Sequence, residues 1–306
     1  MLGQVASKEG VSKTGRKEPA LWTVLRAGWS HDAALHCAHF RIPLLAAIAL
    51  ASILALWLPF AVQRWKEASR MADPVQYPQL GTAMLALAAK DTDFAIKNGR
   101  VQIAGNPLHF SVAGWEVLVD DGSQNEETTP VERGSQTTSM LRIGPDQLLV
   151  HSALTGVAVA AGLRGFEGFG AAVLHHAATD RHLMAAVIGA MLHEAAFGSM
   201  YSSLLTMTLL TALQYMLFVG VLGALLSFAG LRARVKGEGA RLPTGFMAGM
   251  KASLHHTVGM LFLPACLTGV AGFLLPGLPT PMLWLAFSFL AGVRALAFYT
   301  HQYRGS

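Results

Sequence analysis

Charged side chains are scarce in this sequence of 306 residues. Asp, Glu, Lys and Arg together make up 13% of the chain, whereas 53% of the residues are hydrophobic. Two stretches, residues 195–231 and 252–293, contain none of the four charged residue types. Soluble domains rarely allow gaps of this length. The scarcity of charge therefore argues against a soluble protein and indicates a membrane protein.

Cysteine is almost absent, and so are catalytic motifs. Cys37 and Cys266 are the only cysteines, and they are expected at different levels of the membrane, which argues against a disulfide between them. The sequence has no Gly-rich phosphate loop, no Cys-x-x-Cys pair and no Gly-x-Ser-x-Gly elbow. His193-Glu194 begins like a zinc-protease helix, but Phe197 stands where the second histidine is needed. We therefore expect no enzyme activity, no cofactor and no metal ion.

Four apolar runs are long enough to cross a bilayer, which takes roughly 20 residues for about 30 Å of hydrocarbon. They are residues 42–62, 200–230, 254–275 and 282–299. The second run exceeds one crossing, so we expect it to tilt or to project outside. The predicted class is a membrane α-helical protein with four transmembrane helices.

The segments before and between these runs are polar. Residues 1–20 are basic and poor in large apolar side chains, which predicts a disordered tail. Residues 21–41 place Trp22 and Trp29 among polar residues, which fits an interfacial helix or a simple helical lead-in to the first span. Residues 231–253 are predicted to form a basic loop, and residues 300–306 a short tail.

The distribution of charge predicts the orientation. The N-terminal region, the 231–253 loop and the end of the last helix hold 13 Lys and Arg against four acids, whereas residues 64–194 hold 10 against 14. Basic flanks stay in the cytoplasm, so both termini are predicted to be inside. The net charge of +5 follows from these flanks, and we expect no nucleic-acid partner.

Residues 64–199 are predicted to form an inserted α+β extracytoplasmic domain. Apolar and polar residues alternate within residues 92–152, and Asn98-Gly99 is a strong signal for a hairpin turn. This pattern predicts a small antiparallel sheet of four to six strands. Residues 155–198 are predicted to be mainly helical and amphipathic, with a break at Thr179-Asp180. Residues 122–138 are polar and unpatterned, which predicts a loop.

Three ionisable residues lie within or beside the last two spans. His255 and His256 begin the third span, and Arg294 lies near the end of the fourth. Ionisable groups inside a membrane are candidates for an ion or proton path. The alternative is anchoring, because all three lie near the cytoplasmic ends, where long side chains reach the headgroups.

The hairpin region resembles a known family. DFAIKNGRVQI and WEVLVDDGS are similar to two blocks of a bacterial membrane family catalogued as domain of unknown function 1189. Together with the arrangement of spans, the likeness concerns residues 90–150. It implies a protein of the cell envelope without an assigned activity, and some relatives are linked to sugar uptake. The matching residues are Asp93, Phe94, Ile96, Asn98, Gly99 and Asp120, while Asp121 replaces the usual threonine.

These patterns lead to three hypotheses. The first is a non-enzymatic accessory or structural subunit of the bacterial inner membrane, which docks to a larger membrane assembly through its periplasmic domain. Asn98, Gly99, Asp120 and Asp121 are the candidate docking residues, and the expected partners are the bilayer and other membrane proteins. The second is a component of a small-molecule or ion transporter. The third is a metal-dependent membrane enzyme that uses the histidine-rich helix.

Overall fold

The computed structural model describes residues 19–90, 92–122, 138–235, 246–275 and 277–304. The predicted tail, apart from Pro19 and Ala20, and nearly all of the 122–138 loop lie outside these residues. The chain forms two compact units. The helical unit comprises the residues up to Leu58 and from Thr211 onward, and the mixed unit comprises Pro59–Leu210.

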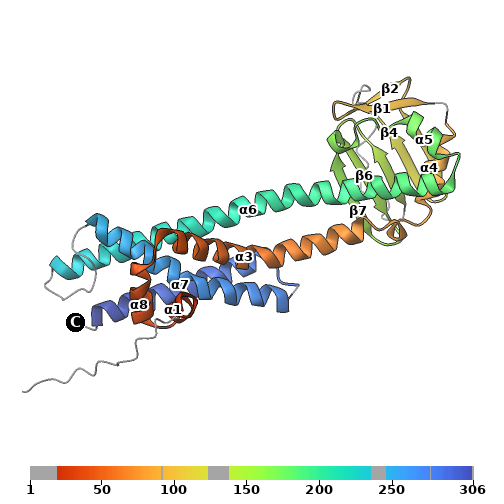
Figure 1. Cartoon of the computed structure of the whole chain (residues 1–306). Coiled ribbons are helices and arrows are strands. Elements are labelled where there is room, and N and C mark those ends of the chain that lie inside the picture. The colour runs from red at the N-terminus through yellow and green to blue at the C-terminus, as the bar shows by residue number, and fades with distance from the viewer. Residues whose placement is uncertain (1–18, 91, 123–137, 236–245, 276, 305–306) are drawn as a thin grey trace, which may run out of the picture. The chain divides into compact units, whose positions relative to one another are not determined.

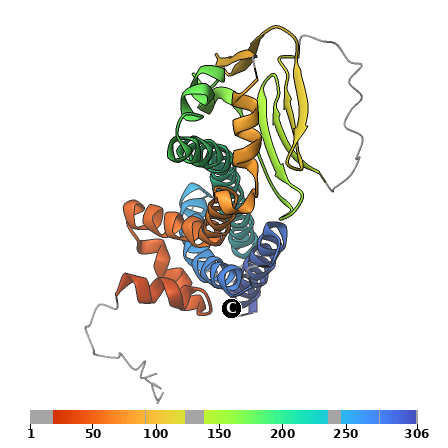
Figure 2. The same cartoon turned by 90° about the vertical axis from the view of Figure 1, so that its right-hand side faces the viewer.

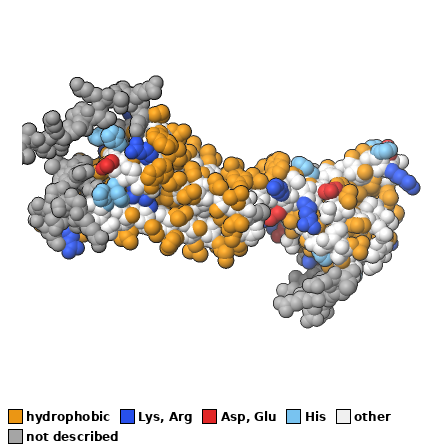
Figure 3. Space-filling model, turned by 90° about the horizontal axis from the view of Figure 1, so that it is seen from below, with side chains coloured by type: hydrophobic (Ala, Val, Ile, Leu, Met, Phe, Trp, Pro, Cys, Tyr) orange, Lys and Arg blue, Asp and Glu red, His pale blue; other side chains and the backbone are white. Residues whose placement is uncertain are grey.

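Four of the described helices are long and apolar enough to cross a membrane, as the sequence predicted. They are α3 (Ile42–Met71), α6 (Arg181–Val235), α7 (Phe246–Leu274) and α8 (Thr280–Arg304) (Figure 1). Figure 3 shows hydrophobic side chains dominating the surface of these spans. Membrane insertion by all four is therefore compatible with their length and composition.

The four helices extend beyond the predicted spans. α3 continues past residue 62 because Gln63–Met71 contains no helix breaker, and Arg64 forms an ion pair of 3.0 Å with Glu67 one turn later. α6 starts before residue 200 and continues to Val235, and α7 begins at Phe246. Both ends of the predicted 231–253 loop are thus helical, while residues 236–245 lie outside the described part. The predicted tail at 300–306 is helical up to Arg304.

The segment before α3 folds as three short helices rather than one. α1 (Ala20–Ala27), α2 (His31–His36) and the 3-10 helix η1 (Cys37–His39) pack against α7. The break falls at Gly28 to Ser30, because the Ser30 hydroxyl caps α2 by accepting from the Ala33 amide at 3.4 Å. A side chain at Gly28 would collide with Leu263 of α7, so only glycine allows this close approach.

The core of the helical unit joins α1 to residues of all four spans, α3, α6, α7 and α8. An ideal Cβ on Gly269 of α7 would collide with the carbonyl oxygen of Ala55 on α3, so the two helices cross at backbone contact. The buried residues of this core include Val24, Leu45, Ile48, Tyr215, Leu261, Ala265 and Phe287.

The described residues of the mixed unit form seven strands in two sheets. β1 (Asp93–Lys97) and β2 (Arg100–Ala104) form a hairpin. β3 (Leu108–Val112), β4 (Trp115–Val119), β5 (Ser139–Ile143), β6 (Gln147–Ser152) and β7 (Val157–Gly162) form the second sheet in that order. The predicted small antiparallel sheet is therefore confirmed only in part, because a second, larger sheet is present and is not wholly antiparallel. β4 and β5 are parallel, because the long segment between them lets the chain return to the same end of the sheet.

The Asn98-Gly99 turn is confirmed. It joins β1 and β2 as a two-residue loop, and Asn98 and Gly99 have φ angles of 53° and 70°. Positive φ at both central positions matches the twist of the flanking strands, which explains why Asn-Gly is favoured here.

The prediction of a helix from residue 155 was wrong at its start. Residues 157–162 form β7, in which Val157 and Val159 are buried while Ala158 and Ala160 are exposed. Alanine and glycine hid this alternation, because they fit a helix as well as a strand by hydropathy.

Within residues 155–198, helical structure begins with the 3-10 helix η3 (Leu163–Phe166) and continues with α5 (Ala171–Ala177). The predicted break at Thr179-Asp180 is confirmed, because the Asp180 carboxylate caps α6 by accepting from the His182 amide at 2.8 Å.

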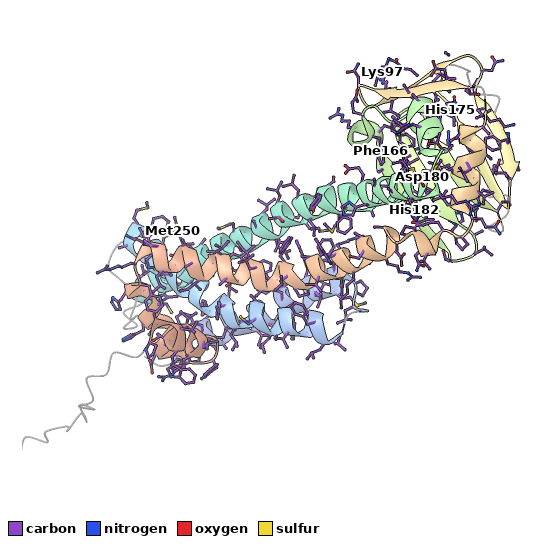
Figure 4. The ribbon with its side chains drawn as sticks, turned by 45° about the vertical axis from the view of Figure 1, so that its right-hand side comes forward. Lys97, Phe166, His175, Asp180, His182 and Met250 are labelled. Carbon is purple, nitrogen blue, oxygen red and sulfur yellow. The ribbon has the colours of Figure 1, made fainter. Side chains whose placement is uncertain are left out.

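Helices cover one face of the larger sheet. α4 (Leu80–Ala88), which the sequence analysis missed, lies beside α5 and the strands β3 and β4 (Figure 2). A 3-10 helix, η2 (Pro74–Gln76), precedes it. Trp115 is fully buried in this core and donates from Nε1 to the Pro78 carbonyl at 2.9 Å. Phe166 reaches the same core from η3 (Figure 4).

Candidate functional site

Arg294 lies inside the helical unit, and its guanidinium contacts two backbone oxygens and one histidine ring. Its Nε and one terminal nitrogen donate to the Ala27 carbonyl at 3.0 and 2.8 Å, and the same terminal nitrogen donates to the Ser30 carbonyl at 3.0 Å. The other terminal nitrogen lies 3.3 Å from His31 Nδ1. The guanidinium therefore caps the C-terminal end of α1, where the helix leaves its carbonyls unpaired and carries partial negative charge.

His255 and His256 make equivalent contacts from α7, nine and ten residues after its start at Phe246. Nδ1 of His256 lies 2.7 Å from the Ala34 carbonyl, and Nδ1 of His255 lies 3.2 Å from the Ala38 carbonyl. Each carbonyl can accept only from a protonated nitrogen, so these distances assign the hydrogen to Nδ1 in both rings. The two histidines hold α2 and η1 as Arg294 holds α1.

These three residues form one basic clamp on the segment before the first span. Phe298 lies between its parts, with its ring centroid 5.8 Å from the His256 ring and 5.8 Å from the Arg294 guanidinium carbon. Each of the three side chains has a backbone partner in α1, α2 or η1. This arrangement favours the anchoring interpretation, while a role in an ion path stays a prediction.

Glu167 fixes the candidate docking turn in the mixed unit. Its two carboxylate oxygens accept from the Asn98 amide at 3.0 Å and from the Gly99 amide at 3.4 Å. An ideal Cβ on Gly99 would lie 2.8 Å from Arg164 Cγ, so η3 also packs against the turn. Lys97, just before the turn, projects from the outer edge of the hairpin (Figure 4).

The other two candidate docking residues adjoin the same edge through a second turn. Asp120 accepts from the Gly122 amide at 2.8 Å, which fixes the chain after β4. Gly122 in turn lies beside the ring of Pro145, whose carbonyl accepts from the Val101 amide of β2 at 3.2 Å. Strand β2, which follows the Asn98-Gly99 turn, and the Asp120-Asp121 segment thus both adjoin Pro145, although they are about twenty residues apart in sequence.

Val75 and Leu154 form an exposed apolar pair that the sequence analysis missed. Their side chains are 77% and 78% exposed. The Thr155 hydroxyl donates to the Gln76 carbonyl at 2.7 Å, so the segment carrying Val75 and the turn carrying Leu154 are held together. An apolar residue beside a Thr-Gly turn is a weak sequence signal, and only the fold shows that the two segments are neighbours.

The histidines considered for a metal site do not gather. His175 lies on α5 and His182 on the first turn of α6 (Figure 4), while His193 stacks on Phe197 with ring centroids 4.4 Å apart. Within the described ranges, no group of three or more His, Cys, Asp or Glu side chains could hold a metal ion.

No family model, curated protein or solved structure matches this chain. The resemblance of residues 90–150 to the bacterial membrane family therefore stays a prediction.

Proposed function

We propose that this chain is a non-enzymatic, multi-pass protein of the bacterial inner membrane. It acts as an accessory or structural subunit, and it docks to a larger membrane assembly through its mixed unit. The distribution of charge supports an orientation with both termini in the cytoplasm, because 13 of the 23 basic residues lie in the termini and in the loop between the second and third spans. The mixed unit is then periplasmic.

The exposed pair of Val75 and Leu154 is the observation that carries this proposal. Among the described residues of the mixed unit, they are the most exposed of the large apolar side chains outside the spans, at 77% and 78%. Two hydrogen bonds fix their position, one from Thr155 to Gln76 and one from Trp115 to Pro78. Apolar side chains held in fixed, water-exposed positions are typical of interaction surfaces.

The test is co-purification in a mild detergent. We expect the native chain to migrate in blue-native electrophoresis as part of a larger assembly with defined partners. Changing both Val75 and Leu154 to Ser should release those partners, whereas Val173→Ser, at another exposed apolar position of the same unit, should retain them. A native chain that runs as a monomer in several mild detergents would refute the proposal.

A transporter component is the alternative proposal. Its residue-level support is the set of His255, His256 and Arg294, whose contacts with α1, α2 and η1 support an anchoring role better. Reconstituted flux of a candidate substrate that survives alanine at all three positions would remove this support. A metal-dependent enzyme predicts bound metal, so elemental analysis of the purified chain tests that third possibility.

A further inference from the structure

β7 forms one edge of the five-stranded sheet. The strand order runs from β3 to β7, and β6 is the only strand paired with β7 among the described residues. An edge strand presents unpaired N–H and C=O groups to its surroundings. The outer side of β7 therefore has the hydrogen-bonding capacity to accept a further strand.

The pairing of β6 with β7 defines which residues face outward. The Leu163 amide donates to the Asp146 carbonyl at 3.2 Å, one residue beyond the end of the strand pair. In an antiparallel pair, hydrogen-bonded positions alternate, so Ala161 and Val159 also face β6. Ala158, Ala160 and Gly162 therefore direct their backbone groups away from the sheet, and all three are exposed.

Nothing in the sequence of β7 protects this edge. Natural edge strands are usually blunted by charged side chains, prolines or bulges. Residues 154–163 contain no charged residue and no proline, and β7 itself contains only Val, Ala and Gly. Its small outward residues leave the backbone accessible to another chain.

A cleft of about 730 Å³ borders the Gly162 end of this edge. Ala160, Ala161 and Gly162 line one side of it. Arg164 and Glu194 also line the cleft and contribute one positive and one negative charge. A Cβ on Gly165 would collide with the Glu194 carboxylate, so η3 and α6 approach each other closely at this point. The α6 side consists mainly of hydroxyl side chains, namely Ser199, Ser202, Ser203 and Thr206.

We infer that the outer edge of β7 takes an extended segment of the partner chain as a sixth strand, and this inference rests on the proposed docking function. The six residues of β7 span about 20 Å at roughly 3.3 Å per residue. The added strand would run from the cleft at Gly162 to the turn before Val157, which carries the exposed Leu154. Main-chain hydrogen bonds supply affinity in this mode of binding, and the apolar pair of Leu154 and Val75 supplies a side-chain contact.

The test compares Ala160→Pro with Ala160→Ser in the full-length chain, purified in mild detergent from its native membrane. Proline removes the outward N–H of residue 160 and is tolerated at such an edge position, whereas serine keeps that N–H. Losing one such hydrogen bond, together with the constraint of the ring, should lower partner recovery by about tenfold or more. The serine variant should recover partners as the native chain does.

Hydrogen exchange in the native assembly tests the same inference without a substitution. The amides of Ala160 and Gly162 should exchange at least about tenfold more slowly in the assembly than in the partner-free chain, because strand addition protects them. This measurement decides the matter if the proline variant fails to fold.

The outcomes separate the two proposals. Partners that stay bound to a folded Ala160→Pro variant, or exchange that is unchanged in the assembly, would overturn the added strand and leave the docking function intact. Slow exchange in partner-free protein in nanodiscs of phosphatidylethanolamine and phosphatidylglycerol would instead assign the edge to lipid and overturn a peptide strand. A native chain without partners would overturn both.

Discussion

Arg294 of α8 donates two hydrogen bonds to a single oxygen, the carbonyl of Ala27 at the end of α1, at 3.0 and 2.8 Å. The two residues are 267 positions apart in sequence. This contact explains why a charged residue is retained near the end of the last span. An arginine buried among apolar residues is stable only when its donors are satisfied, and here backbone carbonyls satisfy them.

We expect Arg294→Gln to release the segment before the first span. Hydrogen bonds from a charged group contribute about 1.5–3 kcal/mol each, and glutamine cannot reach the same carbonyls with a fixed fork of donors. Cys37 reports the change, because it is fully buried and burial raises the pKa of its thiol to about 12. In a Cys266→Ser background, maleimide should label Cys37 much faster in the Arg294→Gln variant.

The matched control for this experiment is Arg232→Gln, which removes an exposed arginine from the same unit. Its labelling rate should equal that of the parent. Equal labelling of all three proteins would contradict the clamp.

Gly269→Ala should destabilise the packing of α3 on α7. The added methyl group would collide with the Ala55 carbonyl, and such overpacking costs about 1–3 kcal/mol. Gly220→Ala is the control, because its Cβ meets nothing within 4 Å. Alanine in place of a helical glycine should there be neutral or stabilising by up to about 1 kcal/mol. Thermal unfolding in detergent measures both, and similar midpoints for the two variants would argue against the close crossing.

Acid should weaken the helical unit through His31. Burial, with smaller contributions from Arg294 and His301, holds the pKa of His31 below its ordinary value of 6.5, although Asp32 acts in the opposite direction. The unfolded chain therefore binds the proton more readily than the folded one. The stability contributed by neutral His31 is present above about pH 6.5 and is lost as the pH falls through the lower, folded-state pKa.

The measurement is the thermal midpoint at about pH 7.5 and about pH 5.5, on either side of the ordinary histidine pKa. The loss on acidification should be smaller in His31→Asn than in the native chain. His182→Asn removes an exposed histidine from the mixed unit and should behave as the native chain does. A loss on acidification that is the same in all three proteins would exclude His31 as its source.

Glu167 should govern the order of the Asn98-Gly99 turn. Glu167→Ala leaves the amides of Asn98 and Gly99 without their carboxylate partner, at a cost of about 1 kcal/mol. Both amides should then exchange faster with solvent, whereas Glu167→Gln, which keeps one side-chain oxygen, should have an intermediate effect. Unchanged exchange in the alanine variant would show that the turn is held by its own φ preference alone.

The sequence by itself determined the elements that depend on local chemistry. Long uncharged runs require helices, because a backbone in hydrocarbon must satisfy its own hydrogen bonds, and the four predicted spans are present as helices. Asn98-Gly99 predicted its turn because few other residue pairs tolerate a positive φ angle at both positions. Asp180 began α6 through its own carboxylate.

Only the tertiary structure decided the features that join distant residues. Arg294, His255 and His256 bind backbone oxygens, which carry no sequence signature. The sequence therefore could not decide between a role in an ion path and a role in anchoring. β7 was hidden because Ala and Gly have little hydropathic contrast, and its strand is defined by pairing with β6. The segments that carry Val75 and Leu154 are held together by the hydrogen bond from Thr155 to Gln76. These two residues are 79 positions apart in sequence, so no local pattern predicts their contact.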